Sequence, residues 1–377
     1  MKNNIKKLIW LSIASCLSIV TFPSCNDEWE DEQYEHYISF KAPLDTQGSS
    51  VGVTTVYVPL TRYNEDGTPR YGAEGITSYD LPILVAGSTD NDRELNIRIA
   101  VDPDTLDNLN YERFNTRTDL YYTNMANLAT FDEVVTIPAG QNMALLHITL
   151  DLRKADYANR YVLPLTIVDA DENGNSYGYE RNPRKNYAKA LLRILPYNYF
   201  SGAYQSPGIK YKLVQDDKLL DENKDKYYNE NIGDVDETNA GDFLYNVQLY
   251  AIDDNNVFFY AGNNDETRLD RKNYKVYAKF QYNEGSTKDG IVTFSADESN
   301  TKLNFLSETP ANFEVAEAPD SKQPFLIRRV YLIRNINYYY TDYTMAKGAE
   351  IKYHVEGNLT MERTLNTQMP EEDQIEW

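Results

Sequence analysis

The sequence predicts an all-β protein made of two consecutive units. Three observations lead to this prediction. Apolar and polar residues alternate with a period of two along several segments, as they do in strands with one buried face. Stretches rich in Gly, Asn and Asp separate these segments, for example 63–75 and 283–290. One segment, 102–114, stands out with a helical pattern, because Pro103 and acidic residues lie near its start.

The first 24 residues are predicted to be a lipoprotein signal peptide. Three lysines precede an apolar run over residues 8–21, which is shorter than the ~20 residues that cross a membrane. Small Ser24 stands directly before Cys25, as lipoprotein signal peptidase requires. Cleavage there makes Cys25 the new N-terminus and the site of lipidation. The predicted mature protein is therefore anchored to a membrane through its lipid alone.

A second cysteine tests this interpretation. Cys16 also follows small residues, but the residues after it belong to the apolar core of the signal. Cys25 is followed by the acidic residues of segment 26–32, so residues 25–36 are predicted to form a solvated tether. An ordinary secretory signal with an incidental cysteine is the alternative.

Composition limits the classes of partner and chemistry. The 377-residue chain has a net charge of −21, and removal of the signal peptide with its three lysines leaves −24. Such a charge repels phosphate backbones, so nucleic acid is not expected as a partner, whereas a neutral ligand rich in hydroxyls is not repelled. Both cysteines precede the folded part, which excludes disulfides, cysteine nucleophiles and cysteine-based zinc sites. The chain contains 32 tyrosines, which suit half-exposed strands and binding surfaces alike.

The boundary between the two units is predicted near 195–204, which gives an N-terminal domain over 37–196 and a C-terminal domain over 197–377. In the second domain, strands with one apolar face are expected at 243–251, 274–282 and 351–362. Gly357 lies inside the last of these strands and predicts a bulge or bend, as at the corner of a barrel.

Three phrases of the first domain resemble a known family when they occur in this order: "LNYERF", "VVTIPAGQNMALLHITLDL" (134–152) and "RYVLPLTIVDA" (160–170). They are similar to the N-terminal β-sandwich domain of Bacteroides surface lipoproteins, which also precedes some secreted endo-glycosidases. The end of the chain, "IKYHVEGNLTMERTLN" (351–366), is similar to the C-terminal domain of such lipoproteins of unknown function.

The resemblance covers nearly all of the mature chain and implies a fold more than an activity. It implies an immunoglobulin-like β-sandwich followed by an antiparallel β domain, either a lipocalin-like barrel or a second sandwich. It also implies lipid anchoring in the outer membrane, facing the cell exterior, and a role in polysaccharide utilisation beside SusC/SusD-type uptake proteins. No catalytic residue carries over, and the D-x-x-D-x-D-x-E string of the endo-glycosidases is absent.

One loop matches a calcium-binding pattern. In "DADENGNSYGYE", oxygen-bearing side chains occupy the ligand positions of an EF-hand loop: Asp169, Asp171, Asn173 and Glu180. The entering segment "YVLPLTIV" is a strand rather than a helix, so a plain turn is favoured and a calcium loop of another type is the alternative. No other cofactor is expected.

The remaining titratable residues do not indicate an enzyme. The three histidines, His36, His147 and His354, have no metal-ligand spacing and are predicted to lie in the tether or on solvated strand faces. No G-x-S-x-G motif occurs, and acidic pairs carry little information in a chain with 58 carboxylates. A hydrolase is the least favoured function.

Clustered tyrosines are the candidate binding residues, since an aromatic ring stacks on the C–H face of a sugar. The first candidate platform contains Tyr338, Tyr339, Tyr340 and Tyr343 with Asn335 and Asn337, and strand-end packing is the alternative for it. Tyr227 and Tyr228 form the second candidate, in a polar loop. The predicted function is therefore a non-enzymatic surface lipoprotein that binds glycan, and the alternative is a structural or adhesive protein that binds another protein.

Overall fold

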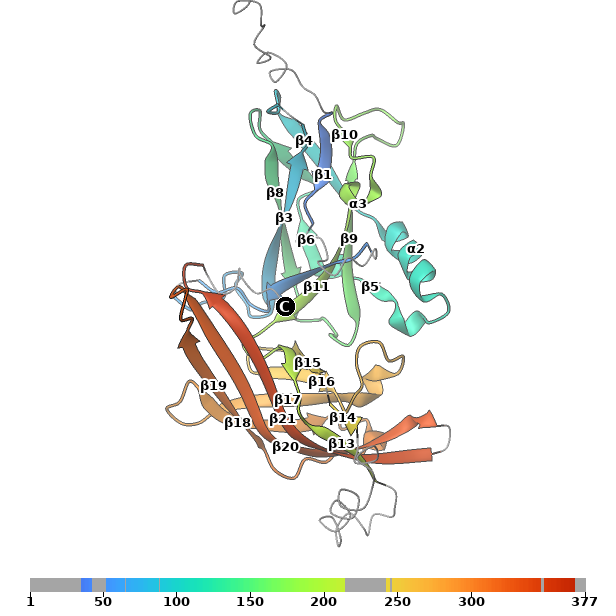
Figure 1. Cartoon of the computed structure of the whole chain (residues 1–377). Coiled ribbons are helices and arrows are strands. Elements are labelled where there is room, and N and C mark those ends of the chain that lie inside the picture. The colour runs from blue at the N-terminus through green and yellow to red at the C-terminus, as the bar shows by residue number, and fades with distance from the viewer. Residues whose placement is uncertain are drawn as a thin grey trace, which may run out of the picture.

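A computed structural model of the chain describes residues 35–42, 52–64, 66–87, 89–213, 242–244, 246–346 and 349–369. In this structure a sandwich of two sheets lies above a barrel (Figure 1). The predicted all-β class is confirmed. The predicted signal peptide, the predicted lipidation site Cys25 and the second tyrosine candidate, Tyr227 and Tyr228, lie outside the described residues.

Two sheets form the N-terminal sandwich. The first has the order β10-β1-β3-β8-β6, with β1 (Tyr37–Phe40), β3 (Ile76–Val85), β6 (Ala129–Phe131), β8 (Met143–Asp151) and β10 (Glu180–Arg181). The second has the order β2-β11-β9-β4-β7, with β2 (Thr54–Pro59), β4 (Leu95–Val101), β7 (Val134–Ile137), β9 (Arg160–Val168) and β11 (Lys189–Tyr197), and β5 (Tyr122–Asn124) pairs with β9.

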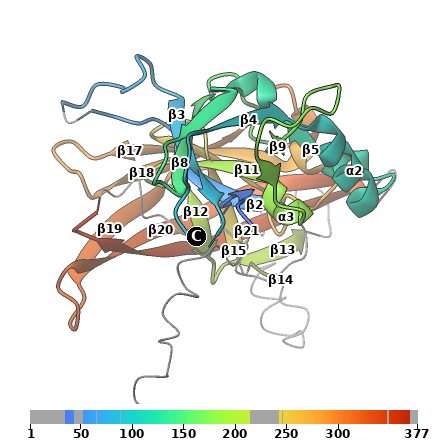
Figure 2. The ribbon, with the colours of Figure 1, turned by 90° about the horizontal axis from the view of Figure 1, so that it is seen from above.

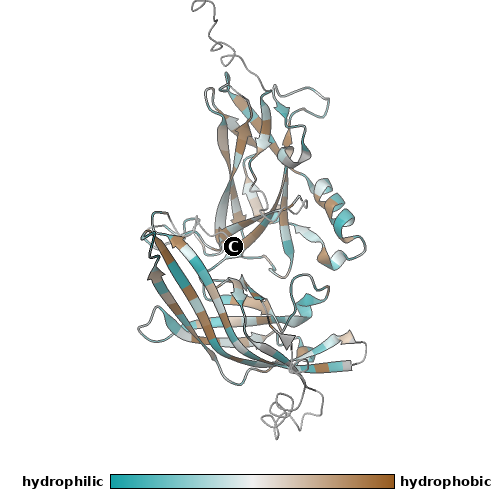
Figure 3. Cartoon of the chain, viewed as in Figure 1, coloured by the Kyte–Doolittle hydropathy of each residue, from teal (hydrophilic) through white to brown (hydrophobic). Residues whose placement is uncertain are grey.

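Alternating apolar residues of both sheets meet in the sandwich core, which explains the period-two pattern of the sequence. On β8, Leu146, Ile148 and Leu150 are buried, while His147 between them points to solvent as predicted. Each fully buried Leu or Ile side chain stabilises the fold by about 1.5–3 kcal/mol relative to an exposed one. Pairing is not wholly antiparallel, because β2 lies parallel to β11. Figure 3 shows the apolar bands that result along the strands.

The predicted helix is present as α2 (Pro103–Phe114). Asp102 caps its N-terminus by accepting a hydrogen bond from the Thr105 backbone N–H at 3.1 Å, and Pro103 occupies the first turn, where no backbone donor is needed. A short helix, α3 (Lys185–Ala188), precedes β11. Within the described part of the chain, no helix has the length and the apolar character to cross a membrane.

The C-terminal domain is a closed antiparallel barrel. Of the two alternatives expected from the sequence, a barrel or a second sandwich, the structure therefore shows the barrel. Eight strands follow one another around it, and the pairing of β12 with β21 closes the ring. They are β12 (Gly202–Gln205), β15 (Asn246–Ala251), β16 (Asn256–Tyr260), β17 (Lys275–Tyr282), β18 (Asp289–Ala296), β19 (Ala311–Pro319), β20 (Leu326–Ala346) and β21 (Ala349–Asn366). Two further strands, β13 (Ile209–Leu213) and β14 (Asp242–Phe243), extend the sheet beside β21. Figure 2 shows the barrel strands from above, crossing beneath the sandwich.

The bend predicted at Gly357 is present. The register between β20 and β21 shifts from Ile333 to Ile336, and Asn335 in between adopts a left-handed conformation with φ of 61°. Gly357 has φ of 155°, and a Cβ atom there would lie 2.3 Å from the Cα of Gly208. Glycine is therefore required because two backbones approach closely at this corner.

Aromatic side chains fill the barrel. Phe200 and Phe280 stack with ring centroids 3.9 Å apart, and Phe313 meets both rings edge-on. A cavity between Phe259 and Val355 has a volume of only about 10 Å³, close to the minimum for one water molecule. The part of the interior that the structure describes is therefore a packed core, unlike the ligand-holding interior of lipocalins.

Candidate functional site

The first tyrosine candidate does not form an exposed platform. Tyr338 and Tyr340 point into the barrel and are each 2% exposed. Tyr339 points outward, but its ring stacks on His354 with centroids 4.2 Å apart and is buried as well. Tyr343 is half-buried and donates a hydrogen bond to Asn300 at 3.1 Å. The expected exposure is wrong because a barrel buries the inward residues of a strand, while neighbouring groups cover the outward ring.

The amides of this candidate have structural roles. Asn335 forms the bulge, and its backbone N–H donates to Asn358 Oδ1 at 3.2 Å. Asn337 Oδ1 lies 2.9 Å from His354 Nε2. His354 is 0% exposed, so its predicted solvation is wrong, although its side chain does point out of the barrel.

The calcium-type loop is an ordinary turn. Asp171 accepts hydrogen bonds from the backbone N–H groups of Asn173 and Asn175 at 2.9 and 2.8 Å, and bonds from Asn175 lower its pKa. Asp169 accepts from the backbone N–H of Arg181 at 3.2 Å, and Glu180 is exposed on β10. No group of three His, Cys, Asp or Glu side chains capable of holding a metal occurs in the described ranges.

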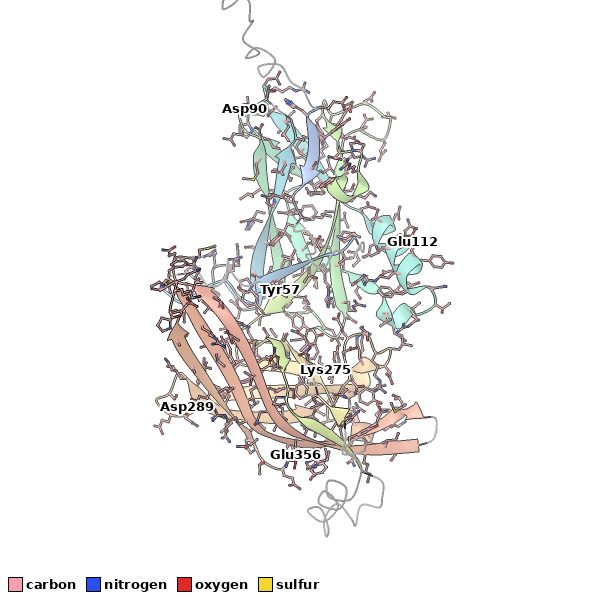
Figure 4. All side chains as sticks on the ribbon, viewed as in Figure 1. Tyr57, Asp90, Glu112, Lys275, Asp289 and Glu356 are labelled. Carbon is pink, nitrogen blue, oxygen red and sulfur yellow. The ribbon has the colours of Figure 1, made fainter. Side chains whose placement is uncertain are left out.

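A polar groove lies elsewhere, between the sandwich and the barrel, with a volume of about 430 Å³. Its walls come from β2 and β11 of the sandwich, from β12 and β15 of the barrel, and from the loop that follows β16. Figure 4 places Tyr57 at the end of the sandwich that faces the barrel. The residues that line the groove are Tyr57, Arg193, Leu195, Ala203, Asn246, Val247, Gln248, Tyr250, Tyr260, Gly262, Asn264, Asp265, Glu266 and Thr267.

Strand alternation directs polar side chains into the groove. On β15, Val247 and Leu249 point into the barrel core, so Asn246, Gln248 and Tyr250 share the outer face. Asn246 and Gln248 are exposed, and Tyr250 is half-buried, since its ring stacks on a neighbouring phenylalanine of β16. The barrel therefore presents two amides and an aromatic edge.

The sandwich supplies the opposite wall through the parallel pair of β2 and β11. Leu195 and Tyr57 are directly paired, so both side chains lie on the same face of the sheet, and Arg193 lies on that face two residues earlier. Tyr57 is half-buried and the Arg193 side chain is 15% exposed.

A loop over residues 261–274 forms the floor of the groove and is held at several points. The buried Tyr338 hydroxyl accepts a hydrogen bond from the Gly262 N–H at 3.0 Å. Asp265 accepts from the backbone and hydroxyl of Thr267 at 2.7 and 2.6 Å. Arg268 forms an ion pair with Asp342 at 3.0 Å. Tyr340 also packs against this loop, because a Cβ atom at Gly262 would lie only 2.1 Å from its hydroxyl. Two residues of the tyrosine candidate, Tyr338 and Tyr340, therefore support the floor of the groove from inside the barrel.

An ion pair connects the two domains across the groove. Glu266 of the loop accepts a hydrogen bond from Arg193 of β11, and Arg160 of β9 lies 3.7 Å from the same carboxylate. Burial alone would raise the pKa of Glu266, but the charges of Arg193 and Arg160 outweigh it and lower the pKa. Glu266 is therefore ionised at neutral pH.

Further hydrogen bonds fix the domains relative to each other. Buried Arg271 of the barrel donates to the backbone carbonyls of Asp119 and Ala158 in the sandwich at 2.8 and 3.2 Å. Tyr63 donates to Asp254 at 2.7 Å, and burial together with this carboxylate raises the pKa of Tyr63 to about 12. Hydrogen bonds with one charged partner are stronger than those between neutral groups. These bonds therefore hold the two domains in a fixed arrangement, with the groove between them.

These features define a two-domain, all-β protein with a polar groove between a sandwich and a closed barrel. The model of a domain of unknown function (DUF4973) matches residues 29–171, and a model described as "-like, C-terminal" matches residues 188–360. The chain is 35% identical to a crystal structure described as an auxiliary nutrient binding protein from Bacteroides thetaiotaomicron, covering 91% of this chain and 100% of that one with a TM-score of 0.72.

Two Bacteroides ovatus structures are similar to a comparable degree. A protein of unknown function is 36% identical, covers 90% of this chain and 100% of that one, and has a TM-score of 0.70. A multidomain protein including DUF1735 is 33% identical with the same coverage and a TM-score of 0.69. The chain belongs to this family of Bacteroides proteins with two β domains. No curated protein matches it.

Part of the groove could be predicted from the sequence. The alternation along 243–251 predicts that Asn246 and Gln248 share an outward face, and the structure confirms this. Arg193 and Glu266 carry no such signal, because they are 73 residues apart in the sequence and meet only when the domains dock.

Proposed function

We propose that the protein is a non-catalytic, lipid-anchored surface protein that captures glycan in the groove between its domains. The observation that carries this proposal is the composition of the groove: half-buried rings of Tyr57 and Tyr250 beside the exposed amides of Asn246 and Gln248. Its volume of about 430 Å³ lies within the range of about 300–1,000 Å³ that is usual for small-ligand sites.

These residue types suit a sugar for physical reasons. A sugar ring has an apolar C–H side, which packs on an aromatic ring, and a rim of hydroxyls, each of which donates and accepts hydrogen bonds. An amide side chain offers two donors and one acceptor oxygen, so Asn246 and Gln248 match adjacent hydroxyls. The amide of Asn246 has no hydrogen-bond partner among the described residues and is open to a ligand.

The charges of the groove favour binding over hydrolysis. Most glycosidases pair a protonated carboxyl, which serves as general acid, with a second carboxylate. Glu266 cannot provide that proton at neutral pH, since Arg193 and Arg160 keep it ionised. This supports a binding protein rather than an enzyme.

The proposed location at the cell surface is supported by the sequence and by a related protein. The predicted lipidation of Cys25 and the acidic tether would hold the domains outside the outer membrane. The similarity to a protein described as an auxiliary nutrient binding protein favours an accessory role in nutrient capture. We infer that the bound glycan is passed to outer-membrane uptake proteins of the SusC/SusD type.

Titration calorimetry on the mature chain, residues 25–377, tests the proposal against plant, fungal and mucin glycans. We expect micromolar or weaker affinity for at least one glycan, unchanged by EDTA. Tyr57→Ala and Gln248→Ala are each expected to weaken binding about tenfold or more, as loss of about 1.4 kcal/mol of contact would. Tyr111→Ala, which removes an exposed ring from α2 outside the groove, should leave affinity unchanged. No binding to any glycan would refute the proposal.

A second candidate function is attachment to another protein. The outer face of the first sandwich sheet exposes Met143 and Leu145, which are 49% and 51% accessible, opposite the half-buried Leu84 and Pro82 of β3. Contiguous apolar patches at a surface are typical of protein contacts. Stoichiometric co-purification of a partner that persists in free sugar and is lost in Leu145→Lys would favour this function.

A further inference from the structure

The groove contains charged groups that can discriminate between ligands. Its charged lining residues are Arg193, Asp265 and Glu266. Arg193 and Glu266 form an ion pair and balance one another. Asp265 is exposed, and only its Oδ1 atom is used, as the acceptor for Thr267. One carboxylate oxygen of Asp265 therefore remains open to a ligand.

The arginines near the groove donate hydrogen bonds to acceptors within the protein. The Nη2 atom of Arg193 donates to Glu266. Behind this wall, Arg160 donates to the Leu120 carbonyl and to a tyrosine hydroxyl of β5. Buried Arg271 donates to two backbone carbonyls of the sandwich. A carboxylate ligand is typically held by the fork of an arginine with two parallel N–H bonds. Both terminal nitrogens of Arg160 and of Arg271 already donate to other acceptors, and the charge of Arg193 is balanced by Glu266.

A neutral sugar and a uronic acid meet this surface differently. A sugar hydroxyl can donate to the open oxygen of Asp265, and a hydrogen bond to a charged acceptor is stronger than one between neutral groups. A uronate carboxylate at the same place has no proton to donate at neutral pH and is repelled by Asp265. The net charge of −21 of the whole chain adds to this repulsion.

We infer that the groove selects neutral glycans with free hydroxyls and rejects glycans built from uronic acids, and that Asp265 is the residue that discriminates. This inference rests on the proposed function, because it specifies the substrate class of the same site. Discrimination of about tenfold or more is expected, since a charged hydrogen bond is replaced by repulsion between two carboxylates.

Matched pairs of probes test the inference. Cellohexaose, mannohexaose and galactohexaose are each compared with their C6-oxidised uronate forms by titration calorimetry at low ionic strength, where repulsion is least screened. We expect the neutral member of a binding pair to bind at least about tenfold more tightly. In Asp265→Asn the neutral probe should weaken and the gap between the two forms should narrow.

The control variant is Asp66→Asn. Asp66 is exposed and accepts the same two bonds from Thr68 that Asp265 accepts from Thr267, but it does not line the groove. It should bind both forms like the wild type. Equal or tighter binding of the uronate form would overturn the inference and leave the proposed function standing. Silence toward all six probes, together with silence toward the wider glycan panel, would overturn both.

Discussion

Asp342 is expected to stabilise both the barrel and the loop that forms the floor of the groove, so Asp342→Asn should lower the free energy of unfolding. Its carboxylate is 3% exposed and accepts hydrogen bonds from Arg268 Nη1 at 3.0 Å and from the Tyr274 hydroxyl at 2.7 Å. In the asparagine variant the side-chain oxygen can still accept from the Tyr274 hydroxyl, but an NH₂ group replaces the oxygen that faces the guanidinium of Arg268. Two donors would then oppose each other in a buried site.

The size of the effect follows from the carboxyl's pKa. Burial raises the pKa of Asp342, but hydrogen bonds from Arg268 and Tyr274 outweigh burial and lower it from 3.8 to about 2. A shift of this size corresponds to about 2 kcal/mol of stabilisation at neutral pH. Removal of one partner from a buried ion pair usually costs about 3–5 kcal/mol. We therefore expect a loss of about 2–4 kcal/mol in the free energy of unfolding.

The pH dependence has a definite sign. The pKa of Asp342 is lower in the folded state than in the unfolded state, so its stabilisation is complete above about pH 5. The stabilisation falls as pH drops from about 4 through 2, because the folded protein must then take up a proton at this site. The difference between wild type and Asp342→Asn should therefore be constant from pH 5 to 8 and shrink toward pH 2.

Urea unfolding, followed by the near-ultraviolet circular dichroism of the tyrosines, measures this difference. Glu284→Gln, which removes an exposed charge from a turn of the same barrel, is the control and should change the free energy by less than about 0.5 kcal/mol. A difference below about 1 kcal/mol at pH 7, or one that persists undiminished at pH 2, would refute the reasoning. Glycan affinity should also fall in Asp342→Asn, since the loop over 261–274 loses an anchor.

Three further predictions concern the same framework. Tyr338→Phe should lower the free energy of unfolding by about 1–3 kcal/mol, because the buried Gly262 N–H loses its acceptor, and urea titration at neutral pH checks this. Gly357→Ala should lower the free energy of unfolding by about 2 kcal/mol or more, because its Cβ would collide with Gly208. Wild-type stability of this variant in urea titration would contradict the close contact. Glu266→Gln should destabilise the protein by about 3 kcal/mol, because the guanidinium groups of Arg160 and Arg193 lose their carboxylate partner, and it should make residues 198–201, which join β11 to β12, more sensitive to limited proteolysis.

Local patterns in the sequence predicted the elements of the fold well. The helix over 102–114, the outward position of His147 and the bend at Gly357 all depend on neighbours within a few residues, so their signals are complete in the sequence. The turn at 169–175 also follows its local chemistry, because short polar side chains bond to their own backbone.

The tyrosine candidate failed for an instructive reason. Alternation required that Tyr338 and Tyr340 share one face and Tyr339 the other, and the structure agrees. The sequence could not tell which face closes on itself, because burial depends on the partners of the strand. Closure of the barrel by β12 and β21 buried the inner face, while stacking on His354 covered the outer ring.

The sequence by itself determined the all-β class, the order of the two domains and the polar outer face of β15, because side-chain direction along a strand repeats every two residues. Only the tertiary structure decided that the second domain closes into a barrel and that a groove forms where it meets the sandwich. Its contacts join residues far apart in the chain, as with Arg193 and Glu266, 73 residues apart, or Tyr338 and Gly262, 76 residues apart. Such pairs are set by the docking of whole sheets, which no local period encodes.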